Sequence, residues 1–271
     1  MAARLSKWTG GAVLLALLVA TLVPFVLLIF FSFKDHLDIL IDFWGFPSAI
    51  KWENYTVAWE AVQSSIGNSL FVCIVTVLGA VVLGSLSGYV FARHRFPLKG
   101  LLYILLIGVM MIPSLLNTVP LYAIIVKLGM TKSFWGLILP YIAGTQLLGI
   151  LLCRTFFESL PEELFEAARI DGGNEFYIYA RIALPLCLPI LITIGIVTFL
   201  SVYSDYLWPF IVLDQDHQTF TMAAVSLNRS GSSDIGLSFA GYIIGSIPTI
   251  VVILFGMKYY IEGMVAGAVK S

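Results

Sequence analysis

The chain has 271 residues, of which 59% are hydrophobic and only 11% are charged, and its formal net charge is −1. Because soluble domains carry about 25% charged residues, this composition excludes an ordinary water-soluble globule. It also argues against a nucleic-acid-binding protein, which needs a clustered basic surface. The three cysteines lie in or beside apolar runs without disulfide or metal-ligand spacing, so the sequence predicts no metal site.

Six apolar runs are long enough to cross a membrane as helices, since a hydrocarbon core of about 30 Å needs roughly 20 apolar residues per helix. The runs cover residues 11–33, 68–91, 101–126, 134–153, 186–212 and 239–257. Each run is continuously apolar, which favours helices over the alternating strands of a membrane barrel. We therefore predict an all-α membrane protein with six transmembrane helices in a single domain, residues 1–271, whose core is about 66–260.

The first run follows Arg4 and Lys7 in the manner of a signal peptide. Its apolar stretch is longer than a cleavable one, and no small-residue cleavage site follows, so we interpret it as an uncleaved span. Lysine and arginine are more frequent in the connecting segments that lie on the same side as the N-terminus. Because positive residues are retained in the cytoplasm, we predict that both termini are cytoplasmic.

The early connecting segments carry aromatic and basic residues. The loop 34–67 contains aromatic residues that either anchor the chain at the lipid headgroups or pack on an external partner: Trp44, Trp52, Tyr55 and Trp59. The short basic link Arg93–Lys99 is interpreted as a determinant of membrane orientation. In the third run, Pro113 and Pro120 predict kinks.

Polar residues inside the apolar runs are candidates to line a pathway. Asp205 lies in the outer third of the fifth run with Tyr203 beside it, and Asn117 lies in the third run. Burying an ionisable residue is costly unless it is paired or hydrated. Asp205 therefore either lines the pathway, or it lies near the headgroups or is hydrogen-bonded to a neighbouring helix. Asn117 likewise either lines the pathway or makes an interhelical hydrogen bond.

The longest charged stretch, residues 154–185, carries six carboxylates and three arginines between the fourth and fifth runs. Ser159 is predicted to cap a helix there, with Glu162 completing a capping box. Gly172–Gly173 is predicted to end this helix, because glycine accepts the left-handed conformation, and Asn174 to cap a second helix. The segment is thus a cytoplasmic helix–Gly–Gly–helix loop that either docks on another protein or plugs the base of the bundle.

Catalytic chemistry is not indicated. The sequence lacks the phosphate-binding motif G-x-x-x-x-G-K-[ST], so we predict that the chain does not hydrolyse ATP itself. His36, His94 and His217 lie in separate loops, away from any arrangement of nucleophile and base or paired carboxylates. We predict that the chain is not an enzyme and has no catalytic residue and no cofactor of its own.

The spacing Glu166-Ala167-Ala168-x3-Gly172-x9-Ile182-x-Leu184-Pro185 is similar to the coupling-loop signature of permease subunits of ABC importers. Further motifs resemble the carbohydrate-importer branch, in particular the shorter permease of maltose-type transporters. They include Asn54-Tyr55, Gly88-Tyr89-x-Phe91-Ala92-Arg93, Pro161-Glu162-Glu163-Leu164 and Tyr206-Leu207-Trp208-Pro209. The resemblance covers about residues 50–271. One departure is Tyr203-Ser204-Asp205, where relatives commonly carry Trp-Asn before the acidic residue.

The resemblance implies a permease subunit of an ATP-driven importer that translocates a sugar or oligosaccharide delivered by an external binding protein. Its coupling loop would contact a cytosolic ATPase subunit, which would bind ATP and Mg, through Glu166, Ala167, Ala168, Asp171 and Gly172. The outer loop 213–238 is either a solvated connector or a contact for the binding protein through Asp214, Asp216, Asn228 and Arg229. The implied assembly also contains two ATPase subunits. A second homologous permease forms a heterodimer with this chain in a bacterial or archaeal inner membrane.

Two other functions stay open from the sequence. One is an ABC importer permease for another solute, such as a phosphorylated polyol, an amino acid or a peptide. The other is a secondary carrier, which would need paired repeats with broken helices and charges at the membrane midplane. Of these features the sequence offers only Asp205.

Overall fold

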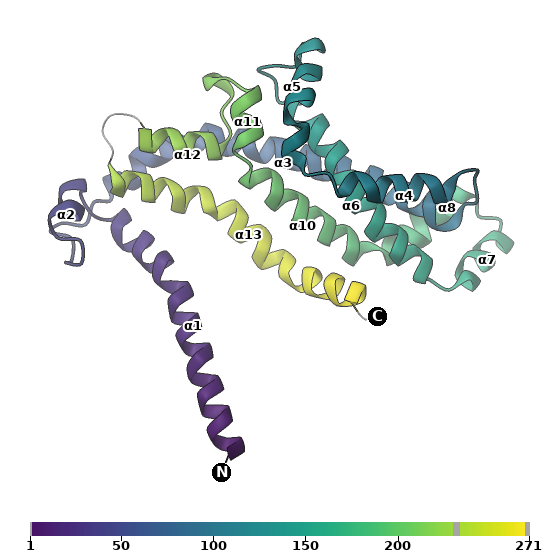
Figure 1. Cartoon of the computed structure of the whole chain (residues 1–271), viewed down its shortest axis with the longest axis horizontal. Coiled ribbons are helices and arrows are strands. Elements are labelled where there is room, and N and C mark those ends of the chain that lie inside the picture. Colours follow the sequence, from purple (N-terminus) through teal and green to yellow (C-terminus); the bar gives the residue numbers. More distant parts are fainter. Residues whose placement is uncertain (1, 230–233, 269–271) are drawn as a thin grey trace. The chain divides into compact units, whose positions relative to one another are not determined.

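The computed structural model describes the backbone of residues 2–229 and 234–268 and the side chains of residues 10–227 and 234–258. Over this part of the chain every regular element is helical and no strand is present, which confirms the predicted all-α class (Figure 1). The longer helices are α1 (Ala2–Ser32), α3 (Glu53–Arg93), α4 (Lys99–Met110), α5 (Thr118–Lys127), α6 (Trp135–Ser159), α10 (Leu188–Ser204), α12 (Phe220–Arg229) and α13 (Ile235–Ala268). The shorter ones are α2 (His36–Ile41), α7 (Glu162–Ile170), α8 (Glu175–Ile178), α9 (Leu184–Leu186) and α11 (Leu207–Val212).

Between four and six segments of the described chain can cross a membrane. The four continuous candidates are Gly10–Ser32, Glu53–Arg93, Trp135–Ser159 and Ile235–Lys258. Two further spans arise if each of two bent helix pairs counts as one. These pairs are Lys99–Met110 with Ser114–Lys127, and Glu175–Leu186 with Leu188–Ser204. The chain is therefore a multi-pass membrane protein, and the number six stays a prediction.

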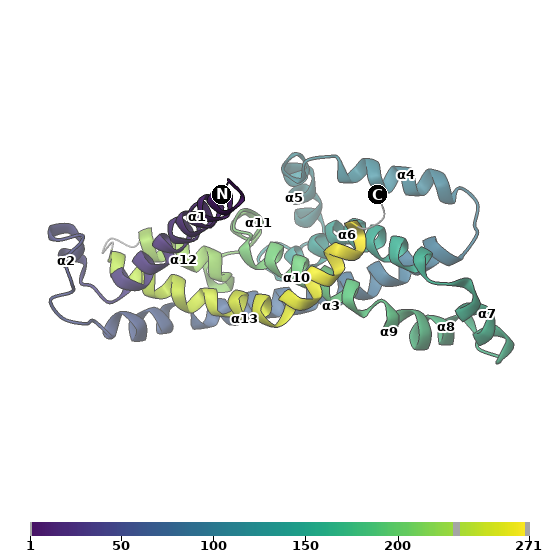
Figure 2. The ribbon, with the colours of Figure 1, turned by 90° about the horizontal axis from the view of Figure 1, so that it is seen from below.

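The third apolar run is broken and not merely kinked. α4 ends at Met110, and Pro113 has an extended conformation before the 3-10 turn Ser114–Asn117. A residue that precedes proline is disfavoured in the helical region, which explains why the helix stops here. Pro120 lies within the first turn of α5, where its missing N–H removes no helical hydrogen bond. The two halves, α4 and α5, meet at 94° (Figure 2). The break sets Asn117 at the start of α5.

α3 is longer than the sequence indicates. The predicted run 68–91 is the second part of a helix of 41 residues, which at 1.5 Å per residue is about 60 Å long. The end of the predicted loop 34–67 is therefore helical. Asn54, Ala58 and Val62 follow one another at a spacing of four residues and are all buried, so this part of α3 is amphipathic.

The chain divides into two compact units. One comprises Met1–Ser64 with Ala223–Ile247, and the other comprises Ser65–Met222 with Pro248–Ser271. In the first unit, the fully buried Lys34 donates from Nζ to the carbonyl oxygens of Asp42 and Gly45, each at 2.7 Å. The Asn54 amide donates to the carbonyls of Ser32 and Lys34 at 2.9 and 3.1 Å. These hydrogen bonds fix the conformation of the first part of the predicted loop 34–67.

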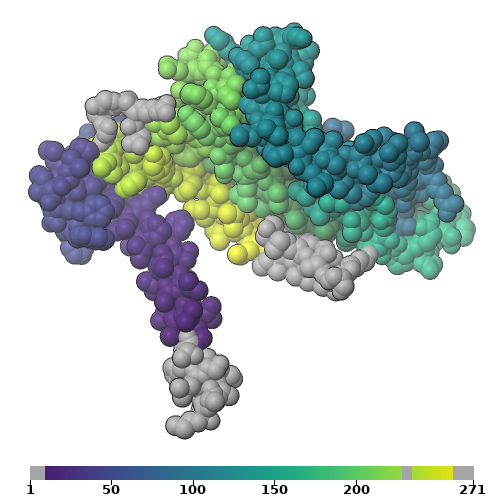
Figure 3. Space-filling model, in the orientation of Figure 1, coloured from purple at the N-terminus to yellow at the C-terminus, as the bar shows by residue number. Residues whose placement is uncertain are grey.

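In the second unit, α3 and α6 approach each other backbone to backbone. A Cβ added at Gly84 would lie 3.1 Å from the Cα of Gly149, so larger side chains at this crossing would force the helices apart. All three cysteines, Cys73, Cys153 and Cys187, are buried within this unit. α5 and α11 contact each other and project together from it (Figure 3).

Candidate functional site

The charged stretch forms a compact hairpin of α7 and α8 at the end of α6. α7 begins after Pro161 and ends at Ile170, and Gly172 then has φ +83°. This left-handed conformation is the one that favours glycine, as predicted. The Asn174 carboxamide oxygen accepts a hydrogen bond from the Tyr177 N–H at 2.8 Å, which confirms Asn174 as the cap of α8.

The predicted cap at Ser159 is wrong. α6 continues to Ser159, whose hydroxyl donates to the Phe156 carbonyl at 2.6 Å within the same helix. α7 starts instead at Glu162, after the N-cap residue Pro161, without a side-chain cap. Glu162 does not complete a capping box, because its carboxylate forms ion pairs with Arg93 and Arg169. Because α6 extends to Ser159, the next helix begins later in the chain than predicted. Glu162 pairs with Arg93 of α3 and with Arg169 near the end of α7.

Arg93 fastens the hairpin to the end of α3. One of its terminal nitrogens donates to the carbonyls of Phe157 and Leu160 at 2.6 and 2.8 Å, and the other contacts Glu162. Its guanidinium carbon lies 3.8 Å from the centre of the Phe165 ring. Although Arg93 is charged, its side chain is only 9% exposed. From the sequence, Arg93 was interpreted only as part of a link that determines membrane orientation. Its position at the end of the motif Gly88–Arg93 was the feature that could have indicated its contact with the hairpin.

A second set of ion pairs ties the two helices of the hairpin together. Arg169 contacts Glu162 at 3.3 Å and Glu175 at 3.4 Å. The Tyr89 hydroxyl donates to Glu175 at 3.3 Å, and His94 lies 3.6 Å from the same carboxylate. Exposed pairs of this kind contribute little stability one by one, but together they fix the orientation of the loop.

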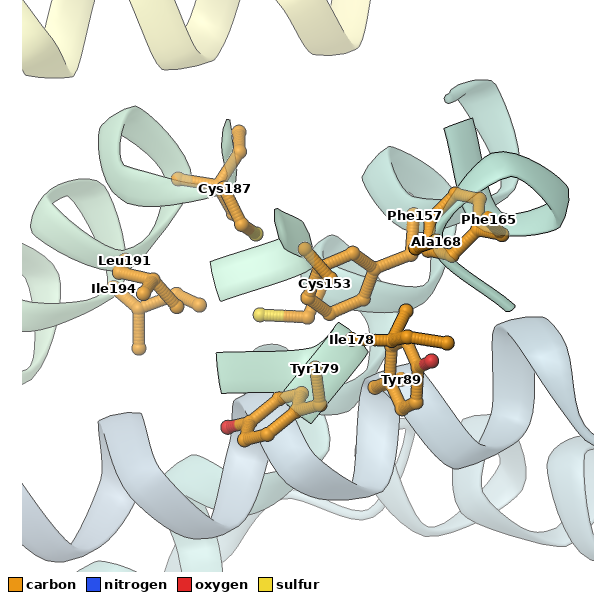
Figure 4. Packing of buried hydrophobic residues seen from close by; sticks show 12 residues of the cluster. Tyr89, Cys153, Phe157, Phe165, Ala168, Ile178, Tyr179, Cys187, Leu191 and Ile194 are labelled. Carbon is orange, nitrogen blue, oxygen red and sulfur yellow. The ribbon is translucent and has the colours of Figure 1, made fainter. Parts of the chain in front are cut away.

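The inner face of the hairpin is apolar. Phe165 and Ala168 of α7 pack with Ile178 of α8 against Phe157 and Cys153 of α6 (Figure 4). Ala168 is only 8% exposed, so its side chain packs within this chain. Of the predicted contact residues, it is the one that belongs to the inner face.

The outer face of the hairpin combines acidic and apolar groups. The remaining predicted contact residues, Glu166, Ala167, Asp171 and Gly172, are exposed. Ile170 and Phe176 are 85% and 74% exposed beside them, which the sequence did not single out. A shallow groove of about 330 Å³ runs along this region, lined by Ala168, Asp171, Gly172, Gly173, Asn174, Tyr177 and Ile182. Such a mixed surface is unusual for water-exposed helices and is typical of a contact site.

A larger cavity of about 660 Å³ lies in the second unit, where α5, α6, α10 and α11 meet. It is lined by Ser114, Leu115, Asn117, Thr118, Leu121, Pro140, Tyr141, Gly144, Thr145, Ser201, Ser204, Asp205, Leu207 and Trp208. The structure thus brings Asn117 and Asp205 together at one cavity. Tyr203 lies away from it, buried between the rings of Phe199 and Phe220 at 5.5 and 5.8 Å.

Asp205 marks a break in the fifth apolar run. α10 ends at Ser204, and the Asp205 carboxylate accepts the Leu207 N–H at 3.0 Å at the start of α11. Its other oxygen accepts the Tyr141 hydroxyl of α6 at 2.7 Å. Asp205 is therefore hydrogen-bonded to a neighbouring helix and also lines the cavity, and its role in lining a pathway stays a prediction.

The described part of the outer loop is held by short polar contacts. The Asn68 amide donates to the Gln218 carbonyl at 3.0 Å. Asp214 contacts His217 at 2.8 Å, and this hydrogen bond, with the more distant charge of Lys132, lowers the pKa of the Asp214 carboxyl. The neighbouring Asp216 is exposed. Of the other two residues predicted here, Asn228 and Arg229, the side chains lie outside the described residues.

Residues 80–264 match the family model described as the binding-protein-dependent transport system inner membrane component. The melibiose/raffinose/stachyose import permease protein MelC of Bacillus subtilis is 36% identical over 266 residues, covering 95% of each chain. The multiple sugar-binding transport system permease protein MsmG of Streptococcus mutans is 32% identical, covering 92% of each.

Two solved structures are similar in fold. One is a chain of a bacterial ABC transporter involved in the import of the acidic polysaccharide alginate. It has a TM-score of 0.78 at 19% identity and covers 95% of this chain and 97% of its own. The other is a chain of the MetNI methionine transporter, with a TM-score of 0.57 at 17% identity, covering 74% of this chain and 95% of its own.

Proposed function

Because the chain belongs to the family of binding-protein-dependent transport system inner membrane components, we propose that it is the permease subunit of an ATP-driven sugar importer. It translocates a sugar or oligosaccharide that an external binding protein delivers. The end-to-end similarity to permeases named for melibiose, raffinose, stachyose and other sugars supports the substrate class.

The observation that carries the proposal is the anchored hairpin with an unpaired acidic outer face. Within the described side chains, the ion pairs of the hairpin involve Glu162 and Glu175, and Glu166 and Asp171 take part in none of them. A solvent-facing carboxylate on a rigid helix suits a charge-assisted hydrogen bond to an arginine of a partner. In our proposal this partner is a cytosolic ATPase subunit, and Glu166 makes the bond.

The proposed contact also explains how ATP binding to the ATPase moves the membrane-spanning helices. ATP and Mg bind to the ATPase, and closure of its two subunits moves the hairpin as a rigid body. Since Arg93 joins the hairpin to α3, and Phe165 and Ala168 join it to α6, these two long helices follow. The substrate path then opens toward the outside.

The rest of the assembly follows from the same function. We propose a second homologous permease as the membrane partner and two ATPase subunits in the cytoplasm. Both termini of this chain are cytoplasmic, and the loop with Asp214 and Asp216 faces the external binding protein. The hydrogen bond that orders Asp214 supports a structured contact there.

The test is co-purification and uptake with the assembled complex. An ATPase chain is expected to co-purify with the wild-type permease, and Glu166→Ala and Gly172→Asp are expected to insert normally but to lose ATP-dependent uptake. The matched control is Glu60→Ala, since Glu60 is an exposed carboxylate of α3 outside the hairpin. Normal uptake by both hairpin variants, or a wild-type permease that transports without any ATPase, would refute the proposal.

A further inference from the structure

We infer that the cavity among α5, α6, α10 and α11 binds a neutral, polyhydroxylated substrate, whose hydroxyl groups donate to the carboxylate of Asp205, and that it disfavours anionic substrates. This inference rests on the proposed function and names the substrate class of the same path. The cavity volume of about 660 Å³ falls within the range of small-molecule sites, ~300–1,000 Å³.

The first argument is the hydrogen bonding of Asp205. Its contacts are donors: the Tyr141 hydroxyl at 2.7 Å, the Leu207 N–H at 3.0 Å and, more weakly, the Trp208 N–H at 3.5 Å. An ionised carboxylate offers about four acceptor positions and no donor. The side chain is only partly buried, so acceptor capacity faces the cavity. Asp205 can therefore accept a sugar hydroxyl while α6 and α11 fix its orientation.

The second argument is the charge of the cavity. Among the described residues that line it, Asp205 is the acidic residue, and lysine, arginine and histidine are absent. A phosphate or carboxylate on a substrate would face this carboxylate without a cation to offset the repulsion. Neutral hydroxyl groups meet no such repulsion. The cavity therefore favours a neutral sugar over the phosphorylated polyol that the sequence left open.

The third argument is the remaining wall chemistry. Ser201, Ser204 and Asp205 are spaced i, i+3, i+4 and line the same cavity, and Asn117 lines it from the turn before α5. Hydroxyl and amide groups both donate and accept, as the hydroxyls of a sugar do. Leu115 and other apolar side chains complete the wall. A few polar groups on an apolar surface suit a sugar ring, which has apolar faces and a polar edge.

The experiment uses the complete transporter with its ATPase, second permease and binding protein in proteoliposomes. Uptake and ATP hydrolysis are measured together for radiolabelled raffinose, stachyose, melibiose and trehalose as neutral probes, and for digalacturonate and sucrose phosphate as anionic ones. The variants are Asp205→Asn, which keeps the shape but removes the charge, and Asn117→Leu. Asn117 is exposed, so its replacement leaves the fold intact even if Asp205→Asn does not assemble. Glu60→Gln is the control.

We expect the wild type to take up at least one neutral probe. Asp205→Asn should transport about tenfold less sugar per ATP hydrolysed, because the substrate loses a hydrogen bond to a charged group. Its binding-protein-stimulated ATP hydrolysis should stay within about twofold of the wild-type rate. Asn117→Leu should fall in the same direction, and Glu60→Gln should match the wild type. Unchanged sugar per ATP in both cavity variants would overturn the inference alone. Equal uptake of an anionic probe by the wild type would overturn the substrate class, and uptake of no probe would overturn the proposed function as well.

Discussion

Replacing Arg93 by methionine tests whether one buried guanidinium holds the α7–α8 hairpin. Methionine keeps an unbranched apolar stem of similar reach but has no donor. The substitution leaves the carbonyl group of Leu160 without its donor, removes one of the two donors to the Phe157 carbonyl, and removes the cation stacked on Phe165. Arg93→Lys keeps the charge but lacks the planar fork that serves two carbonyls and a carboxylate at once, so its effect should be intermediate.

The magnitude follows from the contacts that are lost. The Leu160 carbonyl, left without a donor, costs about 1–3 kcal/mol, and the cation–π contact with a desolvated ring contributes up to about 2 kcal/mol. Glu162 is 52% exposed, so the loss of its ion pair adds little. We expect local opening of the hairpin to become easier by about 2–4 kcal/mol, the sum of these two effects.

Hydrogen–deuterium exchange of the assembled transporter measures this directly. Amides of residues 161–178 should lose protection by on the order of 10–10³-fold in Arg93→Met, while those of α10 stay protected. Arg95→Met is the matched control, because Arg95 is exposed in the same basic link. Wild-type protection of the hairpin in Arg93→Met would show that the apolar inner face suffices, and the reasoning about Arg93 would be wrong.

Three further predictions concern single contacts. Gly172→Val should reduce uptake severely, because the backbone φ of +83° at this position costs a β-branched residue at least ~1–2 kcal/mol. Gly172→Asn should retain most uptake, and equal uptake by both variants would contradict this prediction. Tyr141→Phe should lower the thermal stability of the purified complex by about 1.5–3 kcal/mol, because it removes a hydrogen bond to the Asp205 carboxylate, and a wild-type melting temperature would count against that bond. The lowered pKa of Asp214 means that its contact with His217 stabilises the outer loop above the ordinary aspartate pKa and is lost as the pH falls through the lowered one. Proteolysis of loop 213–219 should therefore accelerate in acid for the wild type, and Asp214→Asn should abolish this pH dependence.

The parts of the fold that depend on local chemistry were predictable. Apolar length indicated the membrane helices, and Gly172 and Asn174 indicated the turn of the hairpin, because each requirement concerns one or two adjacent residues. The cavity side of α10 could also have been read from the sequence. Ser201, Ser204 and Asp205 share one helical face, and Tyr203 points away from it.

The parts that depend on distant partners were not predictable. Arg93 contacts residues 64 to 72 positions further along the chain, and nothing near it in the sequence indicates those partners. The same holds for Asp205, whose hydroxyl donor Tyr141 lies 64 positions earlier. The predicted helix cap at Ser159 was wrong. Ser159 and Glu162 fit the local pattern of a capping box, whereas the actual helix boundary depends on where α6 ends.

The burial of every cysteine has a practical consequence for measuring motion. Cys73, Cys153 and Cys187 are all enclosed in the second unit, so a thiol reagent in water has no native target. A single Glu163→Cys substitution on the exposed face of α7, outside the proposed ATPase contact, would create the one accessible thiol. Spin labels or fluorophores could then be attached to the hairpin of the otherwise native protein, and its displacement could be followed through each step of the ATP cycle.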